Sequence, residues 1–249
     1  MPTLLLIRHG RTSANATGIL AGWLPGVELD KRGVQQAERL ADRLADLPVC
    51  RVVASPLTRT LQTAAPLASR WSLPVDEDPG IGECRYGAWT GRPLKELAGE
   101  ELWRTVQRAP SSATFPPSDD FEHESIAEMA ARGIATVRRI DREVAAEHGE
   151  HAIWMAISHG DVVKAIVADA LGMHLDAFQR IVIDPASVSV IRYVAGGRPL
   201  VLGVNGPGVD LHGLIPPEQP TATDQPADPR TSDTAKTAAD DGIIGGGPG

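Results

Sequence analysis

Short, uninterrupted apolar segments recur along the chain, and the clearest of them end at polar residues or glycine. The first covers residues 4–7 and a longer one covers residues 152–157. Two further short strands are expected at residues 51–54 and 74–76, each of which includes one charged residue. Apolar runs of strand length without alternation are typical of parallel strands that are buried on both faces. The pattern therefore predicts a mostly parallel sheet.

Segments with helical periodicity separate these strands. We expect helices over the following ranges: 30–47, 57–70, 93–107, 125–149 and 161–172. Asp30 and Asp161 are predicted N-caps, Ser125 and Glu128 form a capping box, and Pro66 is predicted to kink or end its helix. The alternation of strands and helices predicts an α/β fold.

The pattern changes in the C-terminal part of the chain. Alternating apolar residues over 188–194 and 200–204, separated by two glycines, predict a terminal β-hairpin. The segment 205–249 contains seven prolines, eight glycines and no aromatic residue, so we predict that it is disordered. The expected organisation is one domain over residues 1–204 and a tail over 205–249. An irregular insertion at residues 109–124 is a candidate lid.

The charge balance limits the partners. The chain carries 24 basic and 32 acidic residues and has a formal net charge of −8. Most of this excess lies in the 205–249 segment, so residues 1–204 are nearly neutral. Nucleic acids and anionic membranes select basic surfaces, so we expect neither as a partner.

Two further features bear on localisation. No segment approaches the roughly 18 apolar residues of a membrane span, and no basic apolar leader precedes residue 7. Cys50 and Cys84 are far apart and show no metal-ligand spacing. We therefore expect a cytoplasmic protein with two free thiols.

Charged side chains follow the two clearest strands. Arg8 and His9 follow the first apolar run, and His159 follows the run at residues 152–157. If these strands are neighbours in a parallel sheet, both histidines lie at the edge where α/β proteins bind ligands. Arg59, expected in the first turn of a helix, and Asn15 add a cation and a neutral donor. This set predicts a site for a small dianion such as phosphate.

Four motifs in the same order resemble the phosphoglycerate-mutase-like branch of the histidine phosphatase superfamily. They cover about residues 3–204 and are the following: Leu6-Ile7-Arg8-His9-Gly10-Arg11-Thr12 with Asn15, Ser55-Pro56-Leu57 with Arg59, Glu83 with Gly87, Trp89 and Gly91, and Ser158-His159-Gly160. The resemblance implies a three-layer α/β/α, phosphoglycerate-mutase-like fold with a mostly parallel central sheet. It also implies a small phosphorylated metabolite as substrate, and it leaves a homodimer open.

The resemblance further implies a role for each site residue. His9 would be the nucleophile that forms a phosphohistidine, and Glu83 the general acid and base. Arg8, Asn15, Arg59 and His159 would bind the phosphate. The resemblance implies no cofactor and no metal, because arginines and imidazolium would supply the positive charge.

The choice of acceptor rests on departures from the mutase pattern. Ala21 precedes Gly22 and Trp23 where the mutases carry a hydroxyl residue, and no Arg-Arg pair lies between Glu83 and the helix at residues 125–149. We therefore favour a phosphomonoesterase, with a mutase and a non-catalytic phospho-ligand binding module as alternatives. Specificity is expected from the loops around Ala21, Gly22, Trp23 and Trp89 and from the 109–124 insertion.

Overall fold

A computed structural model of the chain describes residues 2–194 and 196–206. From residue 207 onward, the tail predicted at residues 205–249 lies outside the described residues. The elements follow in this order: β1 (Thr3–Arg8), α1 (Ser13–Thr17), α2 (Lys31–Arg43), β2 (Val49–Ala54), α3 (Thr58–Arg70), β3 (Val75–Glu77), η1 (Pro79–Ile81), η2 (Gly87–Trp89), α4 (Leu94–Leu97), α5 (Glu101–Arg108), η3 (Pro110–Ser112), α6 (Ile126–His148), β4 (Ile153–Ser158), α7 (Gly160–Ala170), η4 (Leu175–Arg180), β5 (Val188–Arg192) and β6 (Leu200–Gly206).

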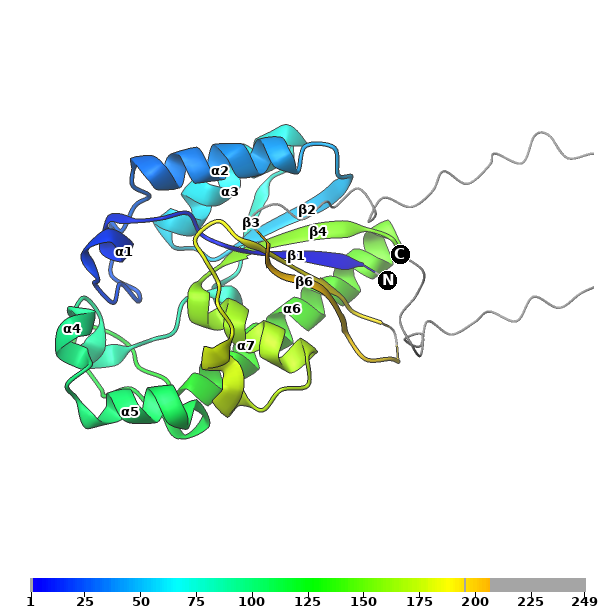
Figure 1. The fold of residues 1–249 in the computed structure, drawn as a ribbon. Coiled ribbons are helices and arrows are strands. Elements are labelled where there is room, and N and C mark those ends of the chain that lie inside the picture. The colour runs from blue at the N-terminus through cyan, green and yellow to red at the C-terminus, as the bar shows by residue number, and fades with distance from the viewer. Residues whose placement is uncertain (1, 195, 207–249) are drawn as a thin grey trace, which may run out of the picture.

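The strands form one mixed sheet in the order β3-β2-β4-β1-β5-β6 (Figure 1). The first four strands in this order run parallel to one another, and β5 and β6 form the predicted antiparallel hairpin. Strand β5 pairs antiparallel with β1, which joins the hairpin to the parallel part. The predicted α/β fold with a mostly parallel sheet is confirmed.

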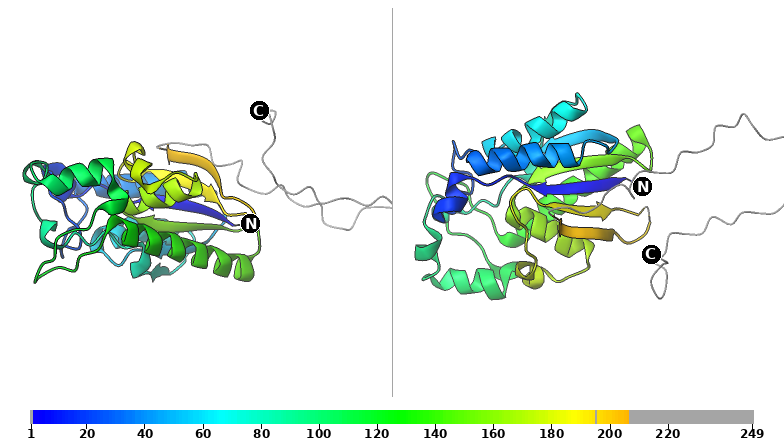
Figure 2. Two further views of the ribbon diagram at one scale, coloured as in Figure 1. Left: turned by 90° about the horizontal axis from the view of Figure 1, so that it is seen from below. Right: turned by 45° about the horizontal axis from the view of Figure 1, so that its top comes forward.

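Helices cover both faces of the sheet. The side chains of β1 point alternately to the two faces, so they contribute to the core on each side. Leu4 and Leu6 pack in a core with α6 and α7, and Leu5 and Ile7 pack in a second core with α2 and α3. All four side chains are fully buried. The views in Figure 2 show the same three layers.

The register of the parallel strands brings their carboxyl ends together. Arg8 lies opposite Ser158, and Ala54 lies opposite Ile157. His9 and His159 are the next residues along β1 and β4, so they leave the sheet side by side. Helices α1, α4 and α5 lie beyond this edge, at the end of the sheet away from the N-terminus (Figure 1).

Two helices differ in detail from the prediction. Helix α3 does not end at Pro66 but continues to Arg70. Proline removes only one backbone donor, and the buried Leu67 and Ala68 hold the helix against the sheet. The predicted helix over residues 93–107 is divided into α4 and α5. It breaks near Gly99, and Glu100 at this break accepts a hydrogen bond from the Trp89 indole at 2.8 Å.

The other predicted ends show smaller differences. Asp30 caps α2 as predicted, but α7 begins at Gly160 with His159 as its N-cap, so Asp161 lies in the first turn. Strand β6 reaches Gly206, two residues beyond the predicted domain end. Helix α1, inside the first loop, was not predicted.

The 109–124 insertion packs against the body of the protein. The amides of Gly87 and Ala88 donate to the carbonyls of Glu122 and Pro116, and Phe115 is buried. No helix within residues 2–194 and 196–206 is long and apolar enough to cross a bilayer.

Helix α2 approaches the loop after β1 more closely than any side chain would allow. A Cβ atom on Gly33 would lie 2.0 Å from the carbonyl oxygen of Arg11, and a Cβ on Gly10 would lie 2.7 Å from the carbonyl oxygen of Gly33. These two glycines therefore fix the distance between α2 and the loop that begins at His9.

We predict that Gly33→Ala destabilises the protein by about 1–3 kcal/mol, because the new methyl group overlaps a backbone atom. Helix propensity alone would give a gain of about 1 kcal/mol. The matched control is Gly133→Ala in α6, whose Cβ would meet side-chain atoms and no backbone, the nearest being a methyl group of Val162 at 3.2 Å. Urea unfolding of both variants measures the difference, and equal stabilities would contradict the prediction.

Candidate active site

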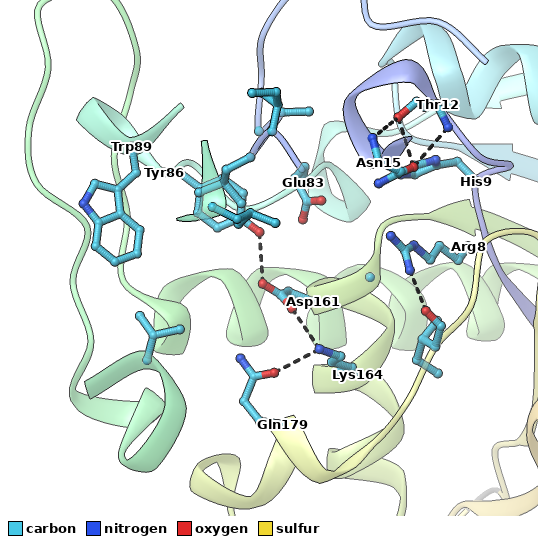
Figure 3. Close-up of a pocket in the computed structure, with 18 of the residues that line it drawn as sticks. Arg8, His9, Thr12, Asn15, Glu83, Tyr86, Trp89, Asp161, Lys164 and Gln179 are labelled. Carbon is cyan, nitrogen blue, oxygen red and sulfur yellow. Dashed lines mark hydrogen bonds and ion pairs between the residues drawn. The ribbon is translucent and has the colours of Figure 1, made fainter. Parts of the chain in front are cut away.

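A cavity of about 500 Å³ opens at the carboxyl edge of the sheet. It is lined by the end of β1, the first loop, α3, the loop of residues 82–91, α5, the start of α7 and η4 (Figure 3). Of the predicted site residues, Arg8, His9, Asn15, Arg59 and Glu83 contribute to this lining, whereas His159 does not.

His9 is held in a defined tautomer. Its Nδ1 lies 2.7 Å from the carbonyl oxygen of Gly10. A carbonyl oxygen can only accept, so Nδ1 carries the proton and Nε2 of the neutral ring keeps its lone pair. Burial lowers the pKa of His9 well below 6.5, and the positive charges of Arg59 and Arg8 lower it further. Nε2 is therefore available as a nucleophile at neutral pH.

The loop after His9 is tied to α3. The amide of Gly10 donates to the hydroxyl oxygen of Thr63 at 3.0 Å, and that hydroxyl donates to the carbonyl of Arg59 at 2.7 Å. The nucleophile and the helix that carries Arg59 are thus fixed relative to one another.

His159 and Arg59 form a buried pair behind His9. Nη2 of Arg59 donates to the Gly22 carbonyl at 2.9 Å and to Nδ1 of His159 at 3.2 Å. Nδ1 therefore accepts, and Nε2 of His159 donates to Oγ of Ser55 at 2.8 Å. The rings of His9 and His159 lie 5.3 Å apart between centroids.

The electrostatics of the site favour a neutral His159. Burial, Arg59 and the neighbouring His9 lower its pKa well below 6.5. Arg59 and Arg8 are therefore the main source of positive charge here, since a guanidinium group does not lose its proton in a protein.

Arg8 and the start of α7 complete the anion site. Nη1 of Arg8 donates to the carbonyl of Ile183 at 2.6 Å. Its Nε is buried without a hydrogen-bond partner among the described residues. Arg8 lies over Gly160, the first residue of α7, where the unpaired backbone N–H groups and the helix dipole favour an anion.

Asn15 has a structural role as well as a place on the cavity wall. Its Oδ1 accepts from the backbone N–H and the hydroxyl of Thr12 at 3.1 and 3.0 Å, which completes the capping box of α1. These bonds leave the Nδ2 of Asn15 as the donor that can reach a ligand.

Glu83 lies next to His159. Its Oε1 accepts from the Cys84 amide at 2.9 Å, and its Oε2 lies 3.8 Å from Nδ1 of His159. Burial raises its pKa to about 7, with a further contribution from the negative charge of Asp161. At neutral pH this carboxyl group can both give and take a proton.

The comparison with protein families agrees with this geometry. The family model described as "Histidine phosphatase superfamily (branch 1)" matches residues 4–205. The chain belongs to this family. The family and the phosphomonoesterase class predicted from the sequence are thereby confirmed.

Individual relatives cover most of the chain. Phosphoserine phosphatase 1 of Hydrogenobacter thermophilus is 30% identical over 207 residues, which cover 82% of this chain and 92% of that protein. An Erwinia tasmaniensis protein named "Probable phosphoglycerate mutase GpmB" is 30% identical over 191 residues, covering 76% and 84%. The crystal structure of the α-ribazole phosphatase from Shigella flexneri has a TM-score of 0.69 and 25% identity, and covers 83% of this chain and 98% of that one.

In this histidine phosphatase the predicted specificity residues have different positions. Ala21, Gly22 and Trp89 line the cavity. Trp23 does not; its indole Nε1 donates to the carbonyl of Glu83 at 2.6 Å, so it supports the loop that carries the acid. No group of three or more potential metal-ligating side chains occurs in the part of the chain that the structure describes.

Arg132 in α6 is a functional residue that sequence reasoning missed. Its guanidinium donates to the carbonyls of Gly80, Gly82 and Glu83 at 3.0, 2.8 and 2.8 Å. It also forms a bidentate ion pair with Glu124, at 2.6 and 3.0 Å. Arg132 therefore holds the backbone of the loop from which Glu83 projects. Its position in α6 gave no local signal, because the three carbonyls that it binds are about 50 residues away in the sequence.

We predict that Arg132→Lys lowers kcat for an alkyl phosphate by about tenfold or more, because one ammonium cannot replace the forked donor set. Inhibition by inorganic phosphate should change little, since the anion site is built on β1, α3 and α7. The control is Arg138→Lys in the same helix, where Arg138 pairs with the partly exposed Asp169. A parallel loss of phosphate affinity would show that Arg132 supports the whole site.

Proposed function

We propose that this protein hydrolyses phosphomonoesters without a metal ion, through a phosphohistidine intermediate on Nε2 of His9. The observation that carries the proposal is the fixed tautomer of His9. Its Nδ1–H donates to the Gly10 carbonyl, which leaves Nε2 unprotonated, and His9 lines a cavity that two arginines also line.

The first step is a displacement at phosphorus. The lone pair on Nε2 of His9 forms the N–P bond, and the ester oxygen leaves with the electrons of the P–O bond. Arg8, Arg59 and the N-terminus of α7 stabilise the negative charge on the phosphoryl oxygens. These groups are already in place, so the reaction requires little reorganisation of charge.

Glu83 acts as the general acid in the first step and as the general base in the second. With a pKa of about 7, a substantial fraction of Glu83 is protonated at neutral pH and can protonate the leaving oxygen. The resulting carboxylate then accepts a proton from the water that attacks the phosphohistidine. Phosphate leaves, and both His9 and Glu83 return to their starting states.

Water is favoured as acceptor over a second substrate hydroxyl. A phosphoglycerate carries a carboxylate as well as its phosphate, and a mutase must hold both. Besides Arg8 and Arg59, the only lysine or arginine lining the cavity in the described residues is Lys164, which pairs with Asp161. Arg138 and Arg139 of α6 form ion pairs with Asp169, Asp78 and Glu143, and neither lines the cavity.

We predict that His9→Ala abolishes release of phosphate from para-nitrophenyl phosphate in the presence of EDTA. Denatured wild-type enzyme, quenched after exposure to a ³²P-labelled ester, should carry an acid-labile and base-stable label that the variant lacks. The matched control is His151→Ala, an exposed histidine in the turn before β4 that should keep full activity. Turnover by the His9 variant would rule out this nucleophile.

We predict that kcat/KM for an alkyl phosphate falls as pH rises through about 7, because Glu83 acts as an acid only while protonated. This limb should be absent in Glu83→Gln, whose kcat/KM for the alkyl ester should fall by about 10²-fold or more. Nitrophenolate leaves without needing a proton. The Glu83→Gln variant should therefore lose far less of its kcat/KM for para-nitrophenyl phosphate than for the alkyl ester.

The matched control for this experiment is Glu77→Gln, which removes an exposed carboxyl group from β3 nearby in the sequence. Equal losses of kcat/KM for the alkyl and the nitrophenyl ester in Glu83→Gln would show that Glu83 is not the acid.

A further inference from the structure

The cavity is much larger than its anion site. The groups that bind phosphate and move protons gather at the end near β1, whereas the remaining space extends over α5, α7 and η4. Cavities of several hundred Å³ are typical of sites for drug-sized ligands. A leaving group as small as a serine side chain would leave most of the 500 Å³ unfilled.

One wall of this outer space carries a continuous polar row. Asp161 and Lys164 of α7 lie 3.4 Å apart between Oδ1 and Nζ. Nζ of Lys164 donates to Oε1 of Gln179 at 2.9 Å. Figure 3 shows these three side chains, with Asp161 also bonded to the Tyr86 hydroxyl. Asp161 and Lys164 are only 24% and 20% exposed, so their positions are largely fixed.

The hydrogen-bonding capacity of the row is only partly used. An ammonium group has three donors, and two of those on Lys164 face Asp161 and Gln179. Within the described residues the amide nitrogen of Gln179 donates to no other group. Each oxygen of Asp161 accepts one bond and retains a second lone pair. Donors and acceptors therefore alternate along the wall.

The charges of the row exclude two kinds of ligand. Lys164 is neutralised by Asp161, so a second carboxylate on the substrate would find no free cation there. An amine would likewise find Asp161 already paired. Hydroxyl groups suit the row, because each hydroxyl both donates and accepts. The remaining walls include Trp103, Phe115 and Ile181, which offer apolar surface to the face of a ring.

We propose that Asp161, Lys164 and Gln179 form a leaving-group subsite that selects phosphomonoesters of a polyhydroxylated ring. The proposal rests on the phosphatase function proposed above. Sugars and the ribose of nucleosides share this chemistry. The vicinal hydroxyls bond to the row, and the apolar face of the ring packs on the aromatic side of the cavity.

The test compares kcat/KM for matched esters under identical conditions. Glucose 6-phosphate is compared with 2-deoxyglucose 6-phosphate, and a nucleoside 5′-monophosphate with its 2′,3′-dideoxy analogue. The fully hydroxylated member of at least one pair should have a kcat/KM about tenfold higher or more. The deoxy analogue lacks a hydroxyl group and so leaves polar groups of the protein unpaired. The pair that shows the preference distinguishes a sugar from a nucleoside.

The variant Gln179→Leu isolates the subsite, because it changes no charge near Glu83. It should lower the ratio of kcat/KM for the preferred hydroxylated ester to that for para-nitrophenyl phosphate by about tenfold. The matched control is Gln35→Leu, an exposed position on α2 outside the cavity that should leave the ratio unchanged.

Three outcomes would overturn the proposal. An active enzyme that prefers phosphoserine or 3-phosphoglycerate over every hydroxylated ester would show that the row binds a carboxylate. An equal loss for all esters in Gln179→Leu would assign that residue a structural role. If the wild-type protein releases phosphate from no ester, para-nitrophenyl phosphate included, the proposed phosphatase function itself is wrong.

Discussion

A buried positive charge sets the properties of this site. Arg59 is only 2% exposed, and unlike a lysine it cannot lose its charge when buried. Its protein partners are the Gly22 carbonyl, His159 and the nearby charge of Glu83. Because a buried charge is costly unless it is well paired, the site favours an incoming dianion. The same charge helps to keep His9 and His159 neutral, so one residue supplies both the electrostatic stabilisation and the free nucleophile.

The sequence was sufficient to predict those site residues whose positions follow from their immediate neighbours in the chain. Strands β1 and β4 end directly before His9 and His159, so predicting two neighbouring parallel strands also predicts two adjacent histidines. Arg59 was predictable because a proline near the start of α3 places it in the first turn. Each of these inferences needs only the residues next to the one concerned.

The features that sequence reasoning missed depend on contacts between distant segments. Arg132 and Trp23 both hold the Glu83 loop, at sequence separations of 49 and 60 residues. Tertiary contacts also explain the two helices that differ from the prediction. Buried neighbours hold α3 together beyond Pro66, and the hydrogen bond from the Trp89 indole lies where the 93–107 helix is divided. Local propensity is a weak guide where tertiary packing supplies more free energy.

The division between the phosphate end and the leaving-group end of the cavity is not complete, because Asp161 belongs to both. It begins the polar row through Lys164, and its negative charge is the second cause, after burial, of the raised pKa of Glu83. A ligand hydroxyl that donates to Asp161 would disperse that charge and so lower the pKa of Glu83. The acid would become stronger but would be protonated in a smaller fraction of molecules at neutral pH. Recognition of the leaving group and its protonation are therefore coupled through one carboxylate. A change of specificity at this wall would also shift the pH range in which the enzyme works.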